Sequence, residues 1–331
     1  MNEKIFFGID GGGTFSRIAL INSDGKVLTK SEAGSTNIYS VTKDEVFKNL
    51  SQLLDSAMKT TRLEKQNLTA GCIGSAGLAR EREKIIFREF ADRLLGKDFP
   101  VLLCSDAEIL LCGGLENPEG YCLIAGTGSI ALGRSSSGKL VRSGGYGYMI
   151  GDEGSAAWIG KTAIARIMRS IDNRDLPTDM SGAILEAAGL TESSELIHYI
   201  HYTADKAQVA SLAPVVTDAA RKGDPLALDI LHKGAAELTL LVKSVIDQSP
   251  WIIKKELVLA GGVIKNNEIL TQKLKEHLTN ELPALSVYMP KGTALEGACM
   301  LAREVSLHNA REASLHNARE TSLHDAKSLS Q

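Results

Sequence analysis

Apolar runs alternate with segments of helical periodicity along the first third of the chain. Residues 5–30 predict strands joined by tight turns, with Asp24-Gly25 as a hairpin signal. Residues 42–58 carry apolar side chains at helical spacing, and Thr42 or Asp44 offers the cap. The pattern then predicts a strand over 70–73, a helix over 81–96, a strand over 100–104 and a helix from 106. The order β-β-β-α-β-α-β-α is typical of an α/β domain.

The same cycle restarts with the apolar strand 121–125, after a polar loop that we interpret as a domain boundary. We expect an N-terminal lobe over residues 1–116 and a C-terminal lobe over 117–303. The second lobe contains a mostly helical insert over about 153–248, with one long apolar face. The lobe ends with a strand at 257–260, a helix that begins near Asn266, and a last helix that packs back on the first lobe.

Two glycine-rich segments strengthen the interpretation as a duplication. Gly12-Gly13-Thr14 precedes Ile-Ala-Leu and Gly-Lys, and Gly126-Thr127-Gly128-Ser129 precedes the same two strings at nearly the same spacing. Glycine lets backbone N–H groups approach an anion closely, and successive N–H groups form an anion-binding concavity. Two such turns on two similar lobes predict a cleft that holds a polyphosphate.

Composition and charge narrow the class of protein. The chain has 331 residues, 44% hydrophobic residues and a formal net charge of −3, so it is globular and has no electrostatic footprint for nucleic acid. The five cysteines form no CxxC pair and lie in apolar surroundings, which favours reduced, buried thiols. We find no targeting signal and no membrane-spanning run, and therefore expect a cytoplasmic protein with no membrane partner.

Residues 133–139 match the glycine and lysine spacing of a Walker A loop. Leu140 follows where that loop needs a hydroxyl for magnesium, so we interpret the segment as a plain turn. The sequence contains neither a nucleophile elbow nor an HExxH helix, which argues against the hydrolases built on those motifs.

Two aspartates stand where apolar strands end. Asp10 directly precedes the first glycine turn, where a carboxylate can hold hydrated Mg²⁺ while Gly13 and Thr14 donate to phosphate oxygens. Asp106 stands where a strand meets a helix. From the residues alone it is equally a helix cap or the carboxylate that accepts a proton from an attacking hydroxyl.

The segment from Gly144 to Ser155 is the densest cluster of glycine, aromatic and acidic residues in the chain. An aromatic ring can lie against a sugar, and Asp152 and Glu153 can accept hydrogen bonds from hydroxyls. The alternative is a helix start capped by Asp152 or Ser155. Residues 35–37 offer further short polar side chains, or an ordinary Ser/Thr turn.

Residues 304–331 carry a degraded eight-residue repeat in which His308, His316 and His324 recur. Eight residues overshoot two helical turns, so the histidines form no straight stripe. We expect a solvated tail rather than a metal site.

Taken together, the motifs GIDGGGT, STN (35–37), GSAG (74–77), SDAE (105–108), AGTGS (125–129), GGYGYMIGDEGSAAWIG (144–160) and AGGV (260–263) resemble the N-acetylglucosamine kinase and BadF-type ATPase family. This family belongs to the sugar kinase, Hsp70 and actin superfamily. The resemblance implies a two-domain α/β actin-like (ribonuclease H-like) fold with duplicated βββαβαβα lobes around a cleft.

The resemblance also implies roles for single residues. Asp106 would be the catalytic base that deprotonates the 6-hydroxyl of N-acetylglucosamine, N-acetylmuramic acid or a related amino sugar. ATP with Mg²⁺ would be bound by Asp10, Gly12, Gly13, Thr14, Thr127, Gly128, Gly261 and Gly262, with Asp10 holding the metal through water. The sugar would be bound by Asn37, Ser75, Gly145, Tyr146, Asp152 and Glu153. A homodimer is implied as well.

Three alternatives stay open. The chain is similar enough to glucosamine kinases for that substrate to be considered. A second enzyme class of the family activates dehydratases or reductases through an iron–sulfur cluster, which needs accessible thiolates. A sugar sensor without activity is the third, but such regulators carry a DNA-binding segment, and no basic helix-turn-helix precedes Ile5.

Overall fold

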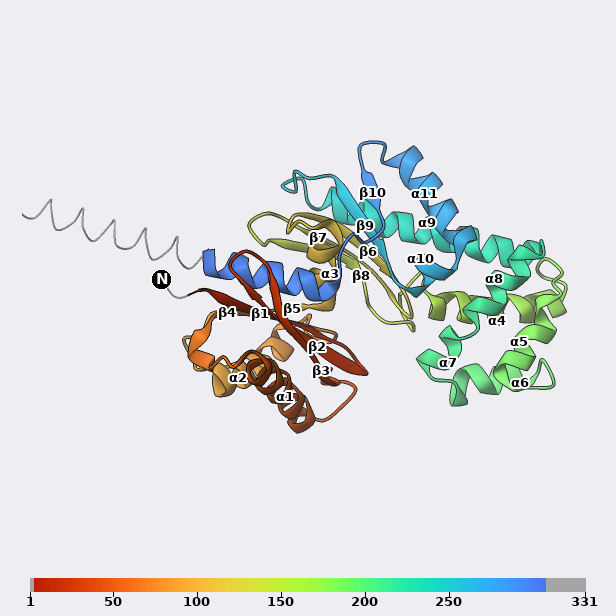
Figure 1. Ribbon diagram of the computed structural model, residues 1–331. Coiled ribbons are helices and arrows are strands. Elements are labelled where there is room, and N and C mark those ends of the chain that lie inside the picture. Colours follow the sequence, from red (N-terminus) through yellow and green to blue (C-terminus); the bar gives the residue numbers. More distant parts are fainter. Residues whose placement is uncertain (1–2, 308–331) are drawn as a thin grey trace, which may run out of the picture. The chain divides into compact units, whose positions relative to one another are not determined.

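The computed structural model describes residues 3–307 and divides the chain into two compact units (Figure 1). Unit 1 combines residues up to Pro118 with the stretch that begins at Lys291. Unit 2 spans Glu119–Pro290. The sequence-based division gives residues 291–303 to the second lobe but expects its last helix to pack back on the first lobe, and the structure groups these residues with the first.

Unit 1 is built on a five-stranded sheet in the order β3-β2-β1-β4-β5. The strands are β1 (Ile5–Gly11), β2 (Phe15–Asn22), β3 (Val27–Gly34), β4 (Leu68–Ser75) and β5 (Val101–Ser105). The first three are antiparallel neighbours, and β4 and β5 run parallel to β1. Parallel neighbours need crossover connections. The helical elements of the unit are α1 (Lys43–Thr61), the short η1 (Lys65–Asn67), α2 (Glu81–Leu95) and α3 (Asp106–Leu115).

Unit 2 repeats this topology, with the sheet order β10-β9-β6-β7-β8. Its strands are β6 (Gly120–Ala125), β7 (Ser129–Arg134), β8 (Leu140–Gly144), β9 (Glu256–Ala260) and β10 (Ser286–Tyr288). Again three antiparallel strands come first, and two later strands add parallel to the first of them. The two sheets confirm the predicted duplication and the two-domain α/β fold.

The helices of unit 2 lie mostly between β8 and β9, as the predicted insert requires. They are α4 (Ala156–Ile171), α5 (Met180–Ala188), α6 (Glu195–His198), η2 (Tyr199–Thr203), α7 (Lys206–Ala210), α8 (Ala213–Arg221), α9 (Pro225–Asp247), α10 (Gly262–Asn266) and α11 (Glu268–Glu281). The helix predicted to begin near Asn266 is α11, which begins at Glu268 with Asn267 as its cap. The short α10 precedes it and begins at Gly262. Gly261, at φ +105°, makes the sharp turn after β9 that lets the helix start at once, and a Cβ there would lie 2.3 Å from the Ala125 carbonyl oxygen.

Each unit has its own hydrophobic core. In unit 2, α9 buries Leu226, Ile230, Leu231, Leu238 and Val242 along one face. Full burial of one such side chain contributes about 1.5–3 kcal/mol. In unit 1, the predicted periodicity of 42–58 is realised in α1, and Thr42 caps this helix in a reciprocal capping box with Glu45.

The two hairpins of the duplication have matching turns. Gly25 and Gly138 have φ values of +83° and +82°, and each donates its N–H to the residue three positions earlier, Asn22 or Ser135. Residues 135–139 therefore form the turn between β7 and β8, which confirms that the Walker A match is a plain turn.

Within unit 1, a helix over residues 294–307 packs closely on α3. A Cβ at Gly297 would lie 1.9 Å from the Ile109 carbonyl oxygen, and one at Gly113 would lie 1.9 Å from the Thr293 carbonyl oxygen. Only glycine permits this approach, which fixes the helix that begins at Asp106. His308, His316, His324 and the rest of the repeat after residue 307 lie outside the described residues.

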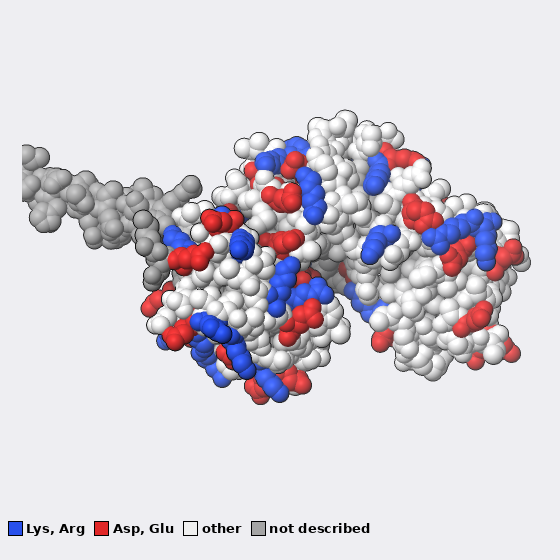
Figure 2. Space-filling model, in the orientation of Figure 1, with Lys and Arg blue, Asp and Glu red and all other residues white. Residues whose placement is uncertain are grey.

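On the face drawn in Figure 2, acidic and basic side chains are interspersed. Over residues 3–307, no helix has both the length and the apolar character needed to cross a membrane.

Candidate active site

The first glycine loop of unit 1 is a tight turn at the end of β1. Gly12 donates its N–H to the Phe15 carbonyl at 3.1 Å, and its own carbonyl accepts from the N–H of Thr36 at 3.3 Å and from Ser35 Oγ at 3.0 Å. Gly13 and Thr14, at the tip, are exposed. The turn predicted to bind phosphate is therefore fastened to the 35–37 segment.

The loop after β4 is hydrogen-bonded to both the glycine turn and the 35–37 segment. Ala76 donates its N–H to the Gly11 carbonyl at 2.9 Å, and Ser75 Oγ donates to the Thr36 carbonyl at 3.2 Å. Ser75 is fully buried, so its hydroxyl links these loops rather than facing solvent. Asn37 lies beside the glycine turn, since a Cβ on Gly13 would be 3.8 Å from Asn37 Nδ2.

Asp106 is the first residue of α3 and is not its cap. Ser105 caps the helix by accepting from the Glu108 N–H, while the Glu108 carboxylate accepts from the Ser105 N–H at 3.0 Å. This excludes the capping interpretation of Asp106. Its carboxylate is solvent-accessible and accepts a hydrogen bond from the Ala107 N–H at 3.0 Å.

The electrostatics of the two aspartates suit proton transfer and metal binding. Surrounding protein atoms raise the pKa of Asp106, against the lowering effect of nearby N–H groups. Burial likewise raises the pKa of Asp10, Arg17 lowers it, and the charge on Asp106 raises it further. The two carboxylates thus interact within unit 1 and would be stabilised by a shared cation.

In unit 2 the second glycine loop is fastened in a similar way. The N–H of Gly126 donates to the Gly128 carbonyl, and the Gly126 carbonyl accepts from the N–H of Ala156 at the start of α4, both at 2.9 Å. Ser129 links the loop to the predicted sugar segment, since its carbonyl accepts from the Gly145 N–H at 2.9 Å and its Oγ donates to the Glu153 carbonyl at 2.7 Å.

The 144–155 segment ends at the cap of α4, and that cap is Ser155. Asp152 is buried and adopts a left-handed backbone at φ +60°. Its Oδ1 accepts from the Gly147 N–H at 3.3 Å, and its Oδ2 forms an ion pair with Lys206 Nζ at 2.8 Å. Tyr146 is 60% exposed, and the Arg142 guanidinium carbon lies 5.5 Å from the centre of its ring.

A cavity of about 530 Å³ in unit 2 brings two predicted nucleotide-binding elements together. Thr127 and Gly262 lie on its wall, while Gly261 and Gly128 neighbour them in sequence. Much of the remaining wall comes from the insert, including Ala210, Pro214 and Arg221. No sequence motif marks these insert residues, because their position depends on how α7 and α8 pack.

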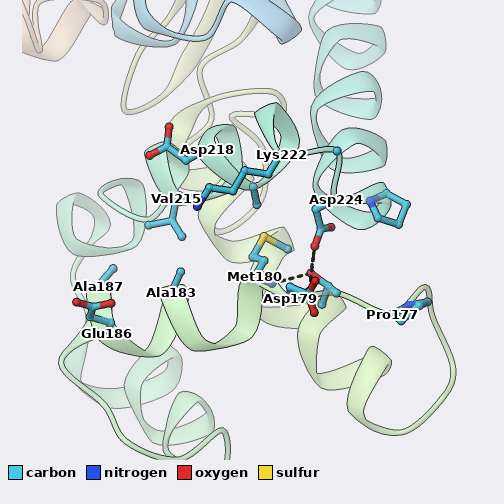
Figure 3. Close-up of a pocket in the computed structure, with 14 residues that line it drawn as sticks. Pro177, Asp179, Met180, Ala183, Glu186, Ala187, Val215, Asp218, Lys222 and Asp224 are labelled. Carbon is cyan, nitrogen blue, oxygen red and sulfur yellow. Dashed lines mark hydrogen bonds between the residues drawn. The ribbon is translucent and has the colours of Figure 1, made fainter.

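A larger cavity of about 750 Å³ lies between α5 and α8 and contains none of the predicted site residues (Figure 3). Met180, Ala183 and Val215 give it an apolar lining. The carboxylate of Asp224 at its edge is already occupied, since it accepts from Thr178 Oγ1 at 2.7 Å and from the Asp179 N–H at 3.1 Å. The smaller cavity is therefore the one of the two that has predicted site residues on its wall.

The five cysteines all lie within the described residues, are buried and form no disulfide. Burial raises the pKa of Cys299 to about 12, and the pKa of Cys104 is raised by its contact with Cys72 and by burial. Cluster ligation requires thiolates at an accessible surface. Within residues 3–307 no group of three or more potential ligands is arranged for a metal ion. The five buried thiols lack the accessibility that such ligation requires.

Comparison of sequences finds relatives over almost the whole chain. The chain is 38% identical over 302 residues to the N-acetylmuramic acid/N-acetylglucosamine kinase of Clostridium acetobutylicum, covering 91% of this chain and 98% of the relative. It is 29% identical over 315 residues to the N-acetyl-D-glucosamine kinase of Dictyostelium discoideum, covering 91% and 98%.

Solved structures share the fold. A protein from Chromobacterium violaceum, provisionally named N-acetylglucosamine kinase, matches with a TM-score of 0.69 and 26% identity, covering 91% of this chain and 100% of the other. A Streptomyces griseus glucokinase of the ROK family matches with a TM-score of 0.53, 17% identity, and coverage of 91% and 99%, which shows the fold alone. The model of the BadF/BadG/BcrA/BcrD ATPase family matches residues 7–302, and the chain belongs to this family.

Proposed function

We propose that this chain is an ATP-dependent kinase that transfers phosphate to the 6-hydroxyl of an amino sugar: N-acetylglucosamine, N-acetylmuramic acid or a close relative. One observation carries the proposal. Asp106, predicted as the catalytic base, is left uncommitted by helix capping and reaches solvent with a raised pKa, while the chain is 38% identical to a kinase for these two sugars.

The nucleotide would occupy the 530 Å³ cavity of unit 2, with Gly261 and Gly262 near its adenosine end and Thr127 near its phosphates. Gly128 and, in unit 1, Gly12, Gly13 and Thr14 would donate N–H and hydroxyl groups to the phosphates. Donors held in a fixed turn stabilise phosphoryl charge without reorganising during the reaction.

Asp106 would accept the proton of the sugar hydroxyl as its oxygen attacks the γ-phosphate. A carboxylate with a raised pKa is a stronger base than an ordinary one. Phosphoryl transfer needs little further covalent chemistry from the protein, so positioning and charge compensation account for the rest.

Asp10 fits a Mg²⁺ site. Its carboxylate is partly desolvated, and the negative charge of Asp106 raises its pKa. Mg²⁺ in kinases is held by one or two carboxylates together with substrate phosphates and water. Bound there, the ion would neutralise charge on the phosphates.

Asn37, Gly145, Tyr146, Asp152 and Glu153 would bind the sugar, with Ser75 supporting the loop of Asn37. Asp152 already accepts two hydrogen bonds, but a carboxylate offers about four acceptor sites, so it retains capacity for a sugar hydroxyl. A homodimer and a cytoplasmic location, where ATP is available, belong to the same proposal.

Glucosamine is the second candidate substrate, because the chain is 24% identical over 298 residues to the glucosamine kinase GspK of Vibrio cholerae. Its free amine is cationic, whereas the N-acetyl group is neutral. A panel of sugars separates the two.

The test is a coupled assay of ADP release over N-acetylglucosamine, N-acetylmuramic acid, glucosamine and glucose, with the wild type beside Asp106→Asn. We expect sugar-dependent turnover that falls by about 10²–10⁴-fold in the variant. Calorimetry should show that the variant keeps its affinity for ADP. Undiminished sugar phosphorylation by the variant would reject Asp106 as the base, and ADP release that no sugar stimulates would reject the kinase assignment.

A further inference from the structure

The helical insert places one cation directly at the second glycine loop. If Gly128 carried a Cβ, that atom would lie 3.0 Å from Lys206 Nζ and 2.6 Å from Asp152 Oδ2. The absence of a side chain at Gly128 thus leaves room for an ion pair against the loop backbone. A larger residue would have to displace it.

The position of Lys206 is fixed by close packing. Helix α7, which begins with Lys206, lies against α4 at Gly160, where a Cβ would approach the Val209 carbonyl oxygen to 2.1 Å. The start of α4 is in turn bonded to the loop, through the Ala156 N–H and the Gly126 carbonyl. Loop, α4 and α7 therefore form one block.

The Lys206 ammonium group is much more exposed than its partner carboxylate. The Lys206 side chain is 38% exposed and that of Asp152 3% exposed. An ammonium has three N–H donors, and Asp152 takes one of those on Lys206 at 2.8 Å. The following residues of α7, Ala207 and Ala210, line the 530 Å³ cavity together with Thr127.

From this geometry we propose that Lys206 is a phosphate ligand: its ammonium, anchored by Asp152, binds the phosphates of the nucleotide held at the Gly126–Ser129 loop. A lysine gives phosphate a compact positive charge, and charge-assisted hydrogen bonds are about twice as strong as neutral ones. The inference rests on the proposed nucleotide site but names a residue that neither the motifs nor the proposed function includes.

The same ion pair joins the nucleotide loop to the sugar segment. Asp152 belongs to the 144–155 segment, so phosphate bound by Lys206 is one side chain away from a predicted sugar ligand. A shift of the ammonium toward phosphate would lengthen its bond to Asp152. Nucleotide and sugar affinities would then be coupled through this pair.

The experiment measures ADP affinity by calorimetry and adenosine binding by NMR titration, for the wild type, Lys206→Met, Lys206→Arg and the double variant Lys206→Met/Asp152→Asn. We expect ADP to bind about 10–100-fold more weakly to Lys206→Met, because a hydrogen bond to a charged group is lost. Lys206→Arg should retain most of the affinity, and adenosine, which has no phosphate, should bind all variants alike.

The double variant separates the two roles of the lysine. It removes the buried carboxylate that Lys206→Met leaves without its partner, so a purely structural defect would be repaired. ADP binding that stays weak supports the proposal, and ADP binding that recovers overturns it, as does an unchanged affinity in Lys206→Met. Lys222→Met, an exposed lysine of the insert on the other cavity, is the matched control.

These measurements read nucleotide binding alone. A wild type that binds ADP but phosphorylates no amino sugar would overturn the proposed function and still return a result for Lys206. A wild type that binds no ADP would overturn both.

Discussion

The Asp106 side chain is accessible to solvent, but its surroundings disfavour the ionised form of its carboxylate. Protein atoms around it raise its pKa, so ionising this carboxylate costs free energy that the fold must supply. Ser105 and Glu108 cap the helix between them, so the Asp106 side chain takes no part in the cap. Active sites commonly keep such groups at the expense of stability.

Replacing Asp106 by Asn should therefore stabilise the fold while it removes the activity. The folded-state pKa lies above the ordinary value of 3.8, so the ionised group destabilises the native state at neutral pH, and this penalty disappears below 3.8. Urea unfolding at pH 7 should show a higher free energy of unfolding for Asp106→Asn than for the wild type, with no difference near pH 3. A variant less stable than the wild type at pH 7 would contradict the electrostatic assignment.

The pH dependence of kcat/KM for the wild type should also reflect the raised pKa of Asp106. Because the base must be ionised, kcat/KM should fall as the pH drops through a pKa above 3.8.

At the scale of single elements, α3 and α1 begin with the same kind of cap, but only α3 begins with a predicted catalytic residue. Each begins with a reciprocal capping box, Ser105 with Glu108 and Thr42 with Glu45. Only the first of these caps sits next to a predicted catalytic residue. Comparing variants of the two caps therefore separates the loss of stability caused by removing a cap from the loss of activity caused by misplacing Asp106.

Ser105→Ala and Thr42→Ala should each lower the free energy of unfolding by about 1 kcal/mol. Ser105→Ala should in addition lower kcat about tenfold, because the first turn of α3 loosens around Asp106. Denaturant unfolding and steady-state kinetics on both variants measure the two effects. Equal kcat values in both variants would show that the cap does not position the base.

The start of α4 shows what sequence can and cannot predict at this scale. Ser155 was one of two predicted caps, and local patterning marked it because a short polar side chain preceded an apolar helix. The ion pair of Asp152 with Lys206 could not be predicted, since the two residues are far apart in sequence. They meet only because Gly160 lets α7 approach α4.

For the whole molecule, the central feature is one topology used twice. Each unit has a sheet of three antiparallel and two parallel-added strands, and each has a separate core. The repeated glycine turns and hairpins predicted this duplication, because the conformation of a turn depends mainly on residues that are adjacent in sequence. For residues 291–303 the sequence predicted that the last helix packs on the first lobe, but not that the whole stretch belongs to unit 1, which depends on the glycine contacts between α3 and the helix over 294–307.

Because unit 2 is continuous in sequence and has its own core, a chain limited to residues 119–290 should fold alone. It should bind ADP, since the 530 Å³ cavity and the second glycine loop lie entirely within it, and it should phosphorylate no sugar without Asp106. Circular dichroism with thermal unfolding and ADP calorimetry test this. A folded fragment that binds no ADP would place the nucleotide elsewhere.

The most direct test of the account is phosphorus NMR of the full chain incubated with ATP, Mg²⁺ and either N-acetylglucosamine or N-acetylmuramic acid. The account predicts a phosphomonoester whose phosphorus couples to the two C6 protons of the sugar, formed by the wild type and lost in Asp106→Asn. Release of inorganic phosphate with no sugar ester, or an ester formed equally by the variant, would contradict it.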